Sequence, residues 1–403
     1  MPKILQINVT CNWGSTGRIA EDIGKLAIAE GWESYIAYGR YKIDSSSNII
    51  KIGTKIDYLF HGALSRITDR TGFYSKRATK AFLKEIDKIK PDIIHLHNIH
   101  GYYIHIGLLF DFIVENNIPI VWTLHDCWSF TGHCSHFDYI GCERWKSGCY
   151  GCPLKSEYPA SSFLDNSKQN YEDKKRLFNA VEGMTIIPVS NWLGGLVEDS
   201  FLGKKDIKVI QNGIDTDVFR PSDGNLRERH DLSNKKILLG VSSVWNKMKG
   251  LDDFIALSKE ITEDQTIVLI GVDEKTKSAL PRNIIAISRT NSLEELMQWY
   301  STADVFINPT WNDSFPTTNL EALACGTPIV TYRTGGSVEA VTEKTGLIVE
   351  KGDIDGLQSA IDAILANGKG YYSDACRKRA VKHFNKQDRY KEYIGVYKEM
   401  LKN

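Results

Sequence analysis

The chain has 403 residues, of which 42% are apolar and 25% are charged, and its 50 basic residues are balanced by 50 acidic ones. A chain of this length is longer than a domain with a single hydrophobic core usually is, so two domains of about 200 residues are expected. A formal net charge of zero argues against a nucleic-acid-binding protein, because such proteins neutralise phosphates with an excess of basic side chains.

The start of the chain, residues 1–9, reads as a short apolar strand. It lacks the basic start, the apolar core and the small-residue cleavage site of a signal peptide. No apolar run approaches the ~20 residues that a membrane span requires. We therefore expect a cytoplasmic protein whose thiols are reduced.

Apolar, strand-like runs alternate with amphipathic helical stretches through both halves, which predicts an α/β fold with parallel sheets and helices on both faces. The strands predicted in the first half are Ile4–Val9, Ser34–Tyr38, Ile93–His97, Ile120–Leu124, Thr185–Pro188 and Lys208–Ile210. Those in the second half are Ile237–Val241, Thr266–Ile270, Ile284–Ile287, Val305–Asn308, Ile329–Thr331 and Gly346–Val349. Between the halves, Asn212–Asp223 contains Gly and Pro and reads as a linker, and residues 387–401 read as a final amphipathic helix.

A glycine-containing turn, Gly-Ser-Thr-Gly-Arg at 14–18, follows the first strand and opens the first helix. Gly14 and Gly17 allow a close backbone approach, and the helix start beside Ser15 favours an anion. The alternative is a simple tight turn, and the spacing alone favours the two equally because it is not the dinucleotide fingerprint. Arg18 could add a charge-assisted contact or be an ordinary surface residue.

Residues 54–90 carry nine lysine or arginine residues against four acidic ones, with aromatic and aliphatic residues between them. A basic amphipathic surface of this kind can dock on an anionic membrane. A solvated pair of helices that packs on the sheet is an equally good interpretation.

His125 follows the predicted strand Ile120–Leu124, so its side chain is expected at the carboxyl end of that strand. A histidine in this position can be a structural hydrogen-bonding group or a site residue. His95 and His97 lie on one face of their strand and read as scaffolding.

Five of the eight cysteines fall between Cys127 and Cys152. Four of them, with spacings of seven, six and two residues, are Cys134, Cys142, Cys149 and Cys152. In a reducing compartment four clustered thiols suggest structural zinc rather than disulfides. His133 or His136 could replace a thiol, and a group of buried or idle thiols is the alternative.

The segment from Asp313 to Glu321 holds two acidic side chains eight residues apart. Pro316 suits the first turn of a helix, and Gly326 with the proline two residues later would end that helix. The backbone amides at the helix start would then bind a phosphate group. The residues expected around this anion are Phe315, Pro316, Thr317 and Thr318. Carboxylates on either side could bind hydroxyls, and a diphosphate flanked by two polyols is a nucleotide sugar.

The spacing of this acidic pair, and the sequence Glu-Ala-Leu-Ala-Cys-Gly-Thr-Pro-Ile that starts at Glu321, resemble retaining glycosyltransferases of the GT-B fold, family four. Other similar pieces occur in the same order, at residues 14–18, 91–97, 123–125, 188–190, 209–215 and 249–250. The resemblance implies two facing Rossmann-like domains with the active site in the cleft between them. It implies an acceptor domain at 1–212, a nucleotide-sugar domain at 213–384, and a last helix at 385–403 that crosses back to the first domain.

The resemblance also implies roles for individual residues. His125 would contact the donor sugar in its neutral form, Lys249 would neutralise the leaving diphosphate, and Glu321 would bind the ribose hydroxyls. Two positions depart from the family, since Ser243 stands where an arginine is expected and Asp313 where a glutamate is expected. Lys247 could replace the arginine, and Arg289 is a weaker candidate for the base pocket.

Together these features predict a retaining glycosyltransferase that moves a sugar from a nucleotide-diphosphate sugar to a glycan or lipid-linked acceptor in bacterial surface polysaccharide synthesis. The resemblance implies no catalytic metal, and a lipid-linked acceptor would bring the protein to the inner face of the membrane. A GT-B nucleotide-sugar epimerase and a non-catalytic nucleotide-sugar-binding scaffold are the alternatives. A glycosidase, which also uses paired carboxylates, is rejected because a hydrolytic site needs no phosphate-binding turns.

Overall fold

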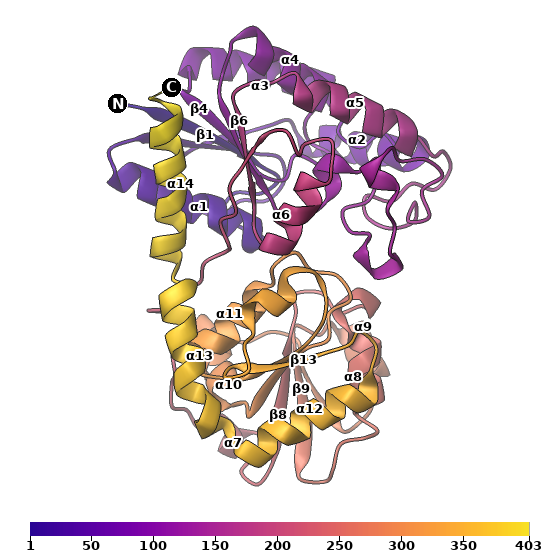
Figure 1. Ribbon diagram of the computed structural model, residues 1–403, viewed down its shortest axis with the longest axis vertical. Helices are drawn as coiled ribbons and strands as arrows, with labels where there is room; N and C mark the ends of the chain where they lie inside the picture. Colours follow the sequence, from indigo (N-terminus) through magenta and orange to yellow (C-terminus); the bar gives the residue numbers. More distant parts are fainter. Residues whose placement is uncertain (403) are drawn as a thin grey trace. The chain divides into compact units, whose positions relative to one another are not determined.

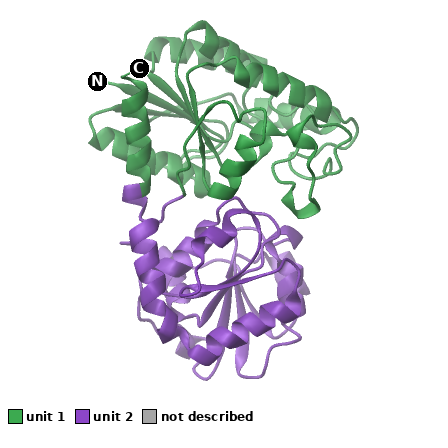
Figure 2. Ribbon diagram, in the orientation of Figure 1, with its two compact units in different colours: residues 1–211, 389–403 green, residues 212–388 purple. Residues whose placement is uncertain are grey.

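The computed structural model describes residues 1–402. The chain forms two compact units, one of residues 1–211 together with the chain from Arg389 onward, and one of residues 212–388 (Figure 2). We call them unit 1 and unit 2.

Unit 1 is built on a seven-stranded sheet in the order β3-β2-β1-β4-β5-β6-β7, with every neighbouring pair parallel (Figure 1). Its strands are β1 Lys3–Asn8, β2 Glu33–Tyr38, β3 Asn48–Lys51, β4 Ile93–Leu96, β5 Ile120–Leu124, β6 Met184–Pro188 and β7 Asp206–Ile207. Its helices are α1 Gly14–Ala29, α2 Lys55–Thr68, α3 Lys76–Ile89, α4 Ile106–Glu115, α5 Ser167–Asn179 and α6 Asn191–Glu198. Short 3₁₀ turns occupy Trp128–Phe130, Asp138–Ile140 and Arg144–Lys146 in the long segment after β5.

Helices cover both faces of this sheet because its central strands are apolar on both sides. Along β5, Val121 packs in a cluster with Ile23 of α1. The next residue, Trp122, faces the other way and packs against Phe110 of α4 and Phe178 of α5. This two-sided burial is typical of parallel sheets and explains why the strands read as continuous apolar runs.

The last helix, α14 Lys386–Met400, packs along the sheet of unit 1 through most of its length (Figure 1). Its Tyr393 and Tyr397 are buried in the same cluster as Val121. The hydroxyl of Tyr397 lies 2.6 Å from His95 Nδ1, and Thr123 Oγ1 donates to the hydroxyl of Tyr393 at 3.3 Å. Polar contacts inside an apolar cluster therefore fix the position of α14 on β4 and β5.

Unit 2 contains a six-stranded parallel sheet in the order β10-β9-β8-β11-β12-β13. Its strands are β8 Lys236–Val241, β9 Gln265–Ile270, β10 Ile284–Ile287, β11 Val305–Asn308, β12 Ile329–Tyr332 and β13 Gly346–Val349. Its helices are α7 Leu226–Arg229, α8 Leu251–Leu257, α9 Glu274–Ala279, α10 Leu293–Thr302, α11 Thr317–Ala324, α12 Ile354–Asn367 and α13 Lys369–His383, with 3₁₀ turns at Lys247–Lys249 and Gly335–Ala340.

Most predicted strands are confirmed, and three expectations need correction. The sequence missed β3, a short exposed strand at the edge of the sheet, and β7 ends before the predicted Lys208–Ile210. The predicted linker Asn212–Asp223 belongs to unit 2, because the guanidinium of Arg377 donates to the carbonyls of Thr216 and Phe219 at 2.8 Å. The glycine and proline in this segment correctly predicted irregular backbone, but the segment is packed on unit 2 and is not a free linker.

The contact between α14 and His95 gives a prediction. Tyr397→Phe removes the hydroxyl but keeps the ring, and it leaves the buried Nδ1 of His95 without its partner. We expect the free energy of unfolding to fall by about 1–3 kcal/mol, measured by urea denaturation. Tyr371→Phe is the matched control, since Tyr371 is exposed. Equal stability of the two variants would contradict the role of this hydrogen bond.

Candidate functional site

In unit 1 the candidate residues follow the carboxyl ends of three adjacent strands. β1 pairs with β4 and β4 pairs with β5, and the segments that continue from them begin with Val9, His97 and His125. Because all three strands are parallel, these segments leave the sheet at the same edge, where α/β proteins bind ligands.

The turn after β1 fits the anion site expected from its glycines. Helix α1 begins at Gly14, and no side chain caps its start. Gly14 has φ +68°, and a Cβ on Gly17 would lie 2.7 Å from Thr10 Oγ1, so both positions require glycine. Ser15 and Arg18 are exposed beside them. The amides at this helix start are therefore available to an anionic group.

His125 lies at the end of a buried chain of hydrogen bonds that starts at Gln6. The Gln6 amide nitrogen donates to the carbonyl of Ala20 at 2.7 Å, so its oxygen faces His97 Nε2 at 3.1 Å. An amide oxygen only accepts, so His97 carries its proton on Nε2 and its Nδ1 accepts. His97 Nδ1 lies 3.1 Å from His125 Nε2, which must then carry the proton. The Nδ1 of His125 is left as an acceptor.

These histidines are neutral. Burial lowers the pKa of His125 to about 4, although the neighbouring charge of Asp126 opposes this. Burial also holds the pKa values of His95 and His97 well below their usual range. The imidazole of His125 therefore presents a neutral hydrogen-bond acceptor at physiological pH.

A second polar pair adjoins His125. Asp126 Oδ2 accepts from His100 Nε2 at 2.8 Å, and Asp126 Oδ1 accepts from the amide of Trp128 at 2.9 Å. Burial alone would raise the pKa of Asp126, but the nearby His100 and these hydrogen bonds lower it to about 2. This aspartate is therefore a fixed negative charge that orients the segment after β5.

The neutral histidines predict a dependence of stability on pH. Between pH 6.5 and 5 the unfolded chain binds protons at His95 and His97 that the folded chain does not bind. The contribution of these two histidines to stability is therefore fully present above pH 6.5 and is lost progressively as the pH falls below it. Denaturation at several pH values should show that stability depends less steeply on pH in His95→Gln than in the native chain. An equal dependence in the native chain and in His95→Gln would refute the assignment.

In unit 2 the structure brings two predicted residues into contact. Lys249 Nζ lies 2.7 Å from Asp313 Oδ2 and 3.5 Å from the carbonyl of Asn312. The second carboxylate oxygen of Asp313 accepts from the amide of Phe315 at 3.2 Å. Lys249 and Asp313 therefore form an ion pair beside the segment that leads into α11.

Two turns of the backbone produce this contact. The side chain of Asn246 accepts from the amide of Lys249 and caps the 3₁₀ turn that carries the lysine. Gly250 follows with φ +75°, and a Cβ there would lie 2.4 Å from the carbonyl oxygen of Pro309. The amide of Trp311 then donates to the carbonyl of Met248 at 2.9 Å. The turn after β8 is thereby fastened to the turn after β11.

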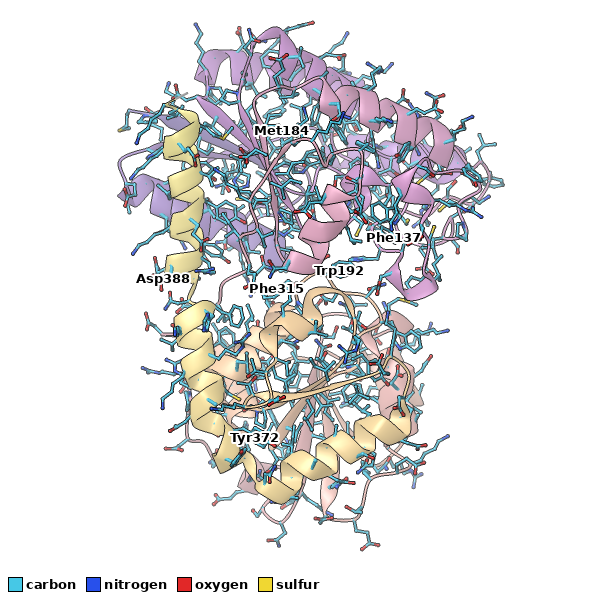
Figure 3. All side chains as sticks on the ribbon, in the orientation of Figure 1. Phe137, Met184, Trp192, Phe315, Tyr372 and Asp388 are labelled. Atoms are coloured by element: carbon cyan, nitrogen blue, oxygen red, sulfur yellow. The ribbon has the colours of Figure 1, made fainter. Side chains whose placement is uncertain are left out.

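Helix α11 has an uncapped start and carries the second acidic residue. It begins at Thr317 with Pro316 just before it, one residue later than predicted, and no side chain caps it. Phe315, labelled in Figure 3, is buried next to this start. Glu321 accepts a hydrogen bond of 2.6 Å from the hydroxyl of Tyr300. Thr317 and Thr318 are half-buried, so the first amides of α11 suit an anion.

The structure does not gather every predicted residue of unit 2 in the same way. Ser243, Lys247 and Arg289 are exposed and follow the strands β8 and β10. They leave the sheet at the same edge as Asp313, but within residues 1–402 no hydrogen bond or ion pair joins them to it. Of the two lysines in the 3₁₀ turn, Lys249 makes the ion pair, which favours it over Lys247 for binding an anion.

The predicted zinc site is not found. Within residues 1–402, no group of three or more His, Cys, Asp or Glu side chains is arranged to hold a metal ion. The four cysteines do line one small cavity, and Cys134 and Cys152 form a thiol hydrogen bond. Cys149 Sγ instead accepts from the amide of Gly132 at 3.1 Å, and burial raises the pKa of its thiol to about 11.

Other contacts order the segment that contains these cysteines, in which Phe137 is labelled in Figure 3. The buried ammonium of Lys174 donates to the carbonyls of Trp128 and Thr131 at 2.7 and 3.0 Å. The carboxylate of Asp69 hydrogen-bonds His133 and accepts from the amide of Asn166 at 2.9 Å. Lys174 of α5 and Asp69, which directly follows α2, thus order the segment for which the sequence suggested structural zinc.

Sequence reasoning missed several residues that position the candidates. Gln6 sets the tautomers of the histidine chain, and Tyr300 orients Glu321. Asn319 is buried inside the acidic segment, where it donates to Ser337 and accepts from Asn308. Gln6 and Asn319 could have been found in the sequence, because each is a polar residue within an otherwise apolar strand or helix face.

Comparisons with known proteins bear on the family of this chain. Two family models match, one described as Glycosyltransferase Family 4 over residues 17–218 and one described as Glycosyl transferases group 1 over residues 235–367. The putative colanic acid biosynthesis glycosyl transferase WcaC of Escherichia coli (strain K12) is 24% identical over 418 residues, which cover 98% of this chain and 100% of the relative.

Solved structures match over both units. Sucrose-phosphate synthase from Thermosynechococcus elongatus has a TM-score of 0.75 at 18% identity, over 100% of this chain and 99% of the other. Anabaena Alr3699/HepE in complex with UDP-glucose has a TM-score of 0.67 at 14% identity, over 98% and 99%. At these identities the matches establish the fold, and the predicted fold class is confirmed.

Proposed function

The chain belongs to glycosyltransferase family 4 and has the GT-B fold, and on this premise we propose the reaction it performs. It transfers a sugar from a nucleotide-diphosphate sugar to a glycan or lipid-linked acceptor of a bacterial surface polysaccharide, on the cytoplasmic side, with retained configuration. The similarity to a putative colanic acid biosynthesis enzyme supports the class of acceptor. The complex of Alr3699/HepE with UDP-glucose supports the class of donor.

The ion pair between Lys249 and Asp313 beside the uncapped start of α11 carries this proposal. A diphosphate at the first amides of α11 would receive hydrogen bonds from the backbone and a charge-assisted contact from Lys249. Asp313 holds the lysine in place until the ligand arrives, and it can then accept from a sugar hydroxyl. Glu321, held by Tyr300, accepts from the ribose hydroxyls.

Unit 1 contributes a neutral imidazole and an anion-binding turn to the proposed reaction. His125 Nδ1 accepts a hydrogen bond from a hydroxyl of the donor sugar, which positions the ring without placing a positive charge near the anomeric carbon. The amides at the start of α1, with Ser15 and Arg18, interact with the sugar phosphate. These residues act by positioning.

The chemical step exchanges one bond at the anomeric carbon for another on the same face. The acceptor hydroxyl oxygen bonds to the anomeric carbon as the bond to the diphosphate breaks, and the hydroxyl proton passes to the leaving diphosphate. Lys249 and the amides of α11 stabilise the charge that grows on the leaving group. Stabilisation of the departing charge is then the main contribution of unit 2.

A panel of nucleotide sugars tests this function. The purified protein is incubated with each donor and an extract of lipid-linked glycans, and the products are separated by mass and analysed by NMR. We expect release of the nucleoside diphosphate together with an elongated glycan of retained configuration. An isomerised donor would instead indicate an epimerase, and binding without turnover in every combination would indicate a scaffold.

Lys249→Met should weaken binding of the nucleoside diphosphate by about 10- to 100-fold, the loss expected for charge-assisted hydrogen bonds. Calorimetry with the diphosphate selected by the panel measures this change. Lys344→Met is the control, because it removes an exposed lysine from the same unit. Lys247→Met asks whether that residue replaces the arginine absent at Ser243. Unchanged affinity in Lys249→Met would exclude its contact with the diphosphate.

Glu321→Gln should affect recognition of the ribose alone. We expect about tenfold weaker binding of the ribonucleoside diphosphate, since a charged acceptor is lost, but little change for its 2′,3′-dideoxy analogue. The exposed Glu343→Gln provides the control. If both ligands weaken equally in Glu321→Gln, the carboxylate supports the helix and does not bind the sugar hydroxyls.

A further inference from the structure

Two aromatic side chains are exposed side by side at the carboxyl edge of the sheet in unit 1. Trp13, in the turn after β1, is 50% exposed, and Tyr41, in the segment after β2, is 55% exposed. Their ring centroids lie 6.1 Å apart, with an angle of 41° between the ring planes. A tryptophan is on average highly buried in a folded protein, whereas Trp13 is half open to solvent beside a second exposed ring.

The backbone fixes the segments that carry the two rings. β1 and β2 are parallel neighbours, and their pairing continues past the strand ends. The amide of Cys11 donates to the carbonyl of Tyr41 at 3.0 Å, and the amide of Ile43 donates to the carbonyl of Cys11 at 3.1 Å. Thr10 Oγ1 donates to the carbonyl of Trp13 at 2.7 Å. Because this backbone is ordered before a ligand binds, the entropy cost of binding there is low.

An arginine without an acidic partner adjoins the ring pair. The guanidinium carbon of Arg40 lies 5.2 Å from the centroid of the Tyr41 ring and 4.3 Å from that of the Tyr58 ring, so cation–π contacts hold it in place. Within residues 1–402 its guanidinium forms no ion pair, and its buried Nε has no hydrogen-bond partner. Arginine binds carboxylates and phosphates through its N–H groups, so Arg40 is available to an anionic group.

A row of rings connects Arg40 with the histidines of the candidate site. The distances between the centroids of successive rings in this row are 6.2, 6.1 and 5.6 Å, and its members are Tyr58, Tyr102, Tyr158 and His100. His100 hydrogen-bonds Asp126, the residue that follows His125. The ring pair and His125 therefore lie at the same edge of one sheet and are joined by continuous side-chain contacts.

We propose that Trp13, Tyr41 and Arg40 form a binding site for an acidic oligosaccharide, which is the acceptor of the transfer reaction. The C–H groups of a sugar ring carry partial positive charge and pack on the electron-rich face of an aromatic ring. An anionic group on the same glycan pairs with the guanidinium of Arg40. The role of this glycan as the acceptor rests on the function proposed above, whereas its binding can be measured without any transfer.

The chemistry of the three side chains favours a glycan over other ligands. Within the described part of the chain, residues 1–402, the indole N–H of Trp13 and the hydroxyl of Tyr41 make no hydrogen bond. Each apolar ring face is therefore bordered by a polar group, and a sugar presents the matching combination of C–H face and hydroxyl rim. An apolar ligand would leave these polar groups and Arg40 unsatisfied, and a free inorganic anion would satisfy Arg40 alone.

Titration of the full chain with matched probes tests the proposal. Two probes are charged sugars, oligogalacturonate with carboxylates and mannose 6-phosphate with a phosphate. The methyl ester of oligogalacturonate keeps the rings but loses the charge, and inorganic phosphate has charge but no ring. NMR of the tryptophan indole groups reports binding, and the Trp13 signal is identified by its loss in Trp13→Phe.

We expect at least one charged sugar to shift the Trp13 signal and to bind at least tenfold more tightly than the methyl ester, since a charge-assisted contact is lost in the ester. The charged sugar that binds more tightly identifies the anionic group. The proposal would be overturned if neither charged sugar shifted this signal, if the ester bound equally well, or if inorganic phosphate alone gave the same shift.

Variants measured by calorimetry with the tighter charged sugar locate the site. Tyr41→Ala should weaken binding at least about fivefold, whereas Tyr41→Phe keeps the ring and should bind nearly as the native chain does. Arg40→Gln should weaken binding by about 10- to 100-fold. The controls are Tyr371→Ala and Arg282→Gln, which change exposed residues of unit 2. Equal losses in the controls would contradict the assignment.

Further measurements separate this site from the donor site. Tyr41→Ala should bind the nucleoside diphosphate selected by the donor panel with native affinity. Glycan binding at Trp13 without transfer in any combination would refute the proposed reaction but not the glycan site. Native transfer rates in Tyr41→Ala at low acceptor concentration would show that the site does not hold the acceptor. A dimer of the native chain that dissociates in Tyr41→Ala, seen by sedimentation velocity, would show instead that a second copy covers the rings.

Discussion

Within each sheet every strand is parallel to its neighbours, and the candidate residues of each unit depend on this constraint. Parallel strands all end at the same edge of their sheet. The segments that follow them are therefore brought together there even when they are far apart in the sequence. In unit 1 the turns after β1, β4 and β5 meet in this way, and in unit 2 the turns after β8 and β11 do. The strands fix where the chemistry lies, and short-range contacts such as Lys249–Asp313 then fix its geometry.

The fold could be predicted from the sequence to the extent that burial is two-sided. Central strands such as β5 and β9 are buried throughout, so they appear as apolar runs that no loop would tolerate. The edge strand β3 is exposed along most of its length, and nothing in its sequence separates it from a loop. For residues 212–223 the composition correctly predicted irregular backbone. It could not predict that this backbone is held on unit 2 by hydrogen bonds from Arg377.

The sequence identified the candidate residues but not the side chains that contact them. Family-like spacing identified Asp313 and Glu321, yet the partner of each lies elsewhere in the chain, Lys249 for one and Tyr300 for the other. The cysteine spacing was misleading for a related reason. A pattern of thiols predicts a metal only if the thiols converge as ligands. The four cysteines line one cavity, but within residues 1–402 no three ligating side chains are arranged to hold a metal ion.

The two units differ in how they manage charge, and this difference follows from burial. In unit 1 the histidines after β4 and β5 are enclosed, so they lose their charge and become neutral hydrogen-bonding groups. In unit 2 Lys249 remains part-exposed and keeps an anionic partner. A reaction that separates a diphosphate from a sugar needs positive charge at the phosphate and none at the electron-poor anomeric carbon. Burial leaves a neutral imidazole at His125 and a paired ammonium at Lys249, which are the charge states that the proposed reaction assigns to the sugar and to the diphosphate.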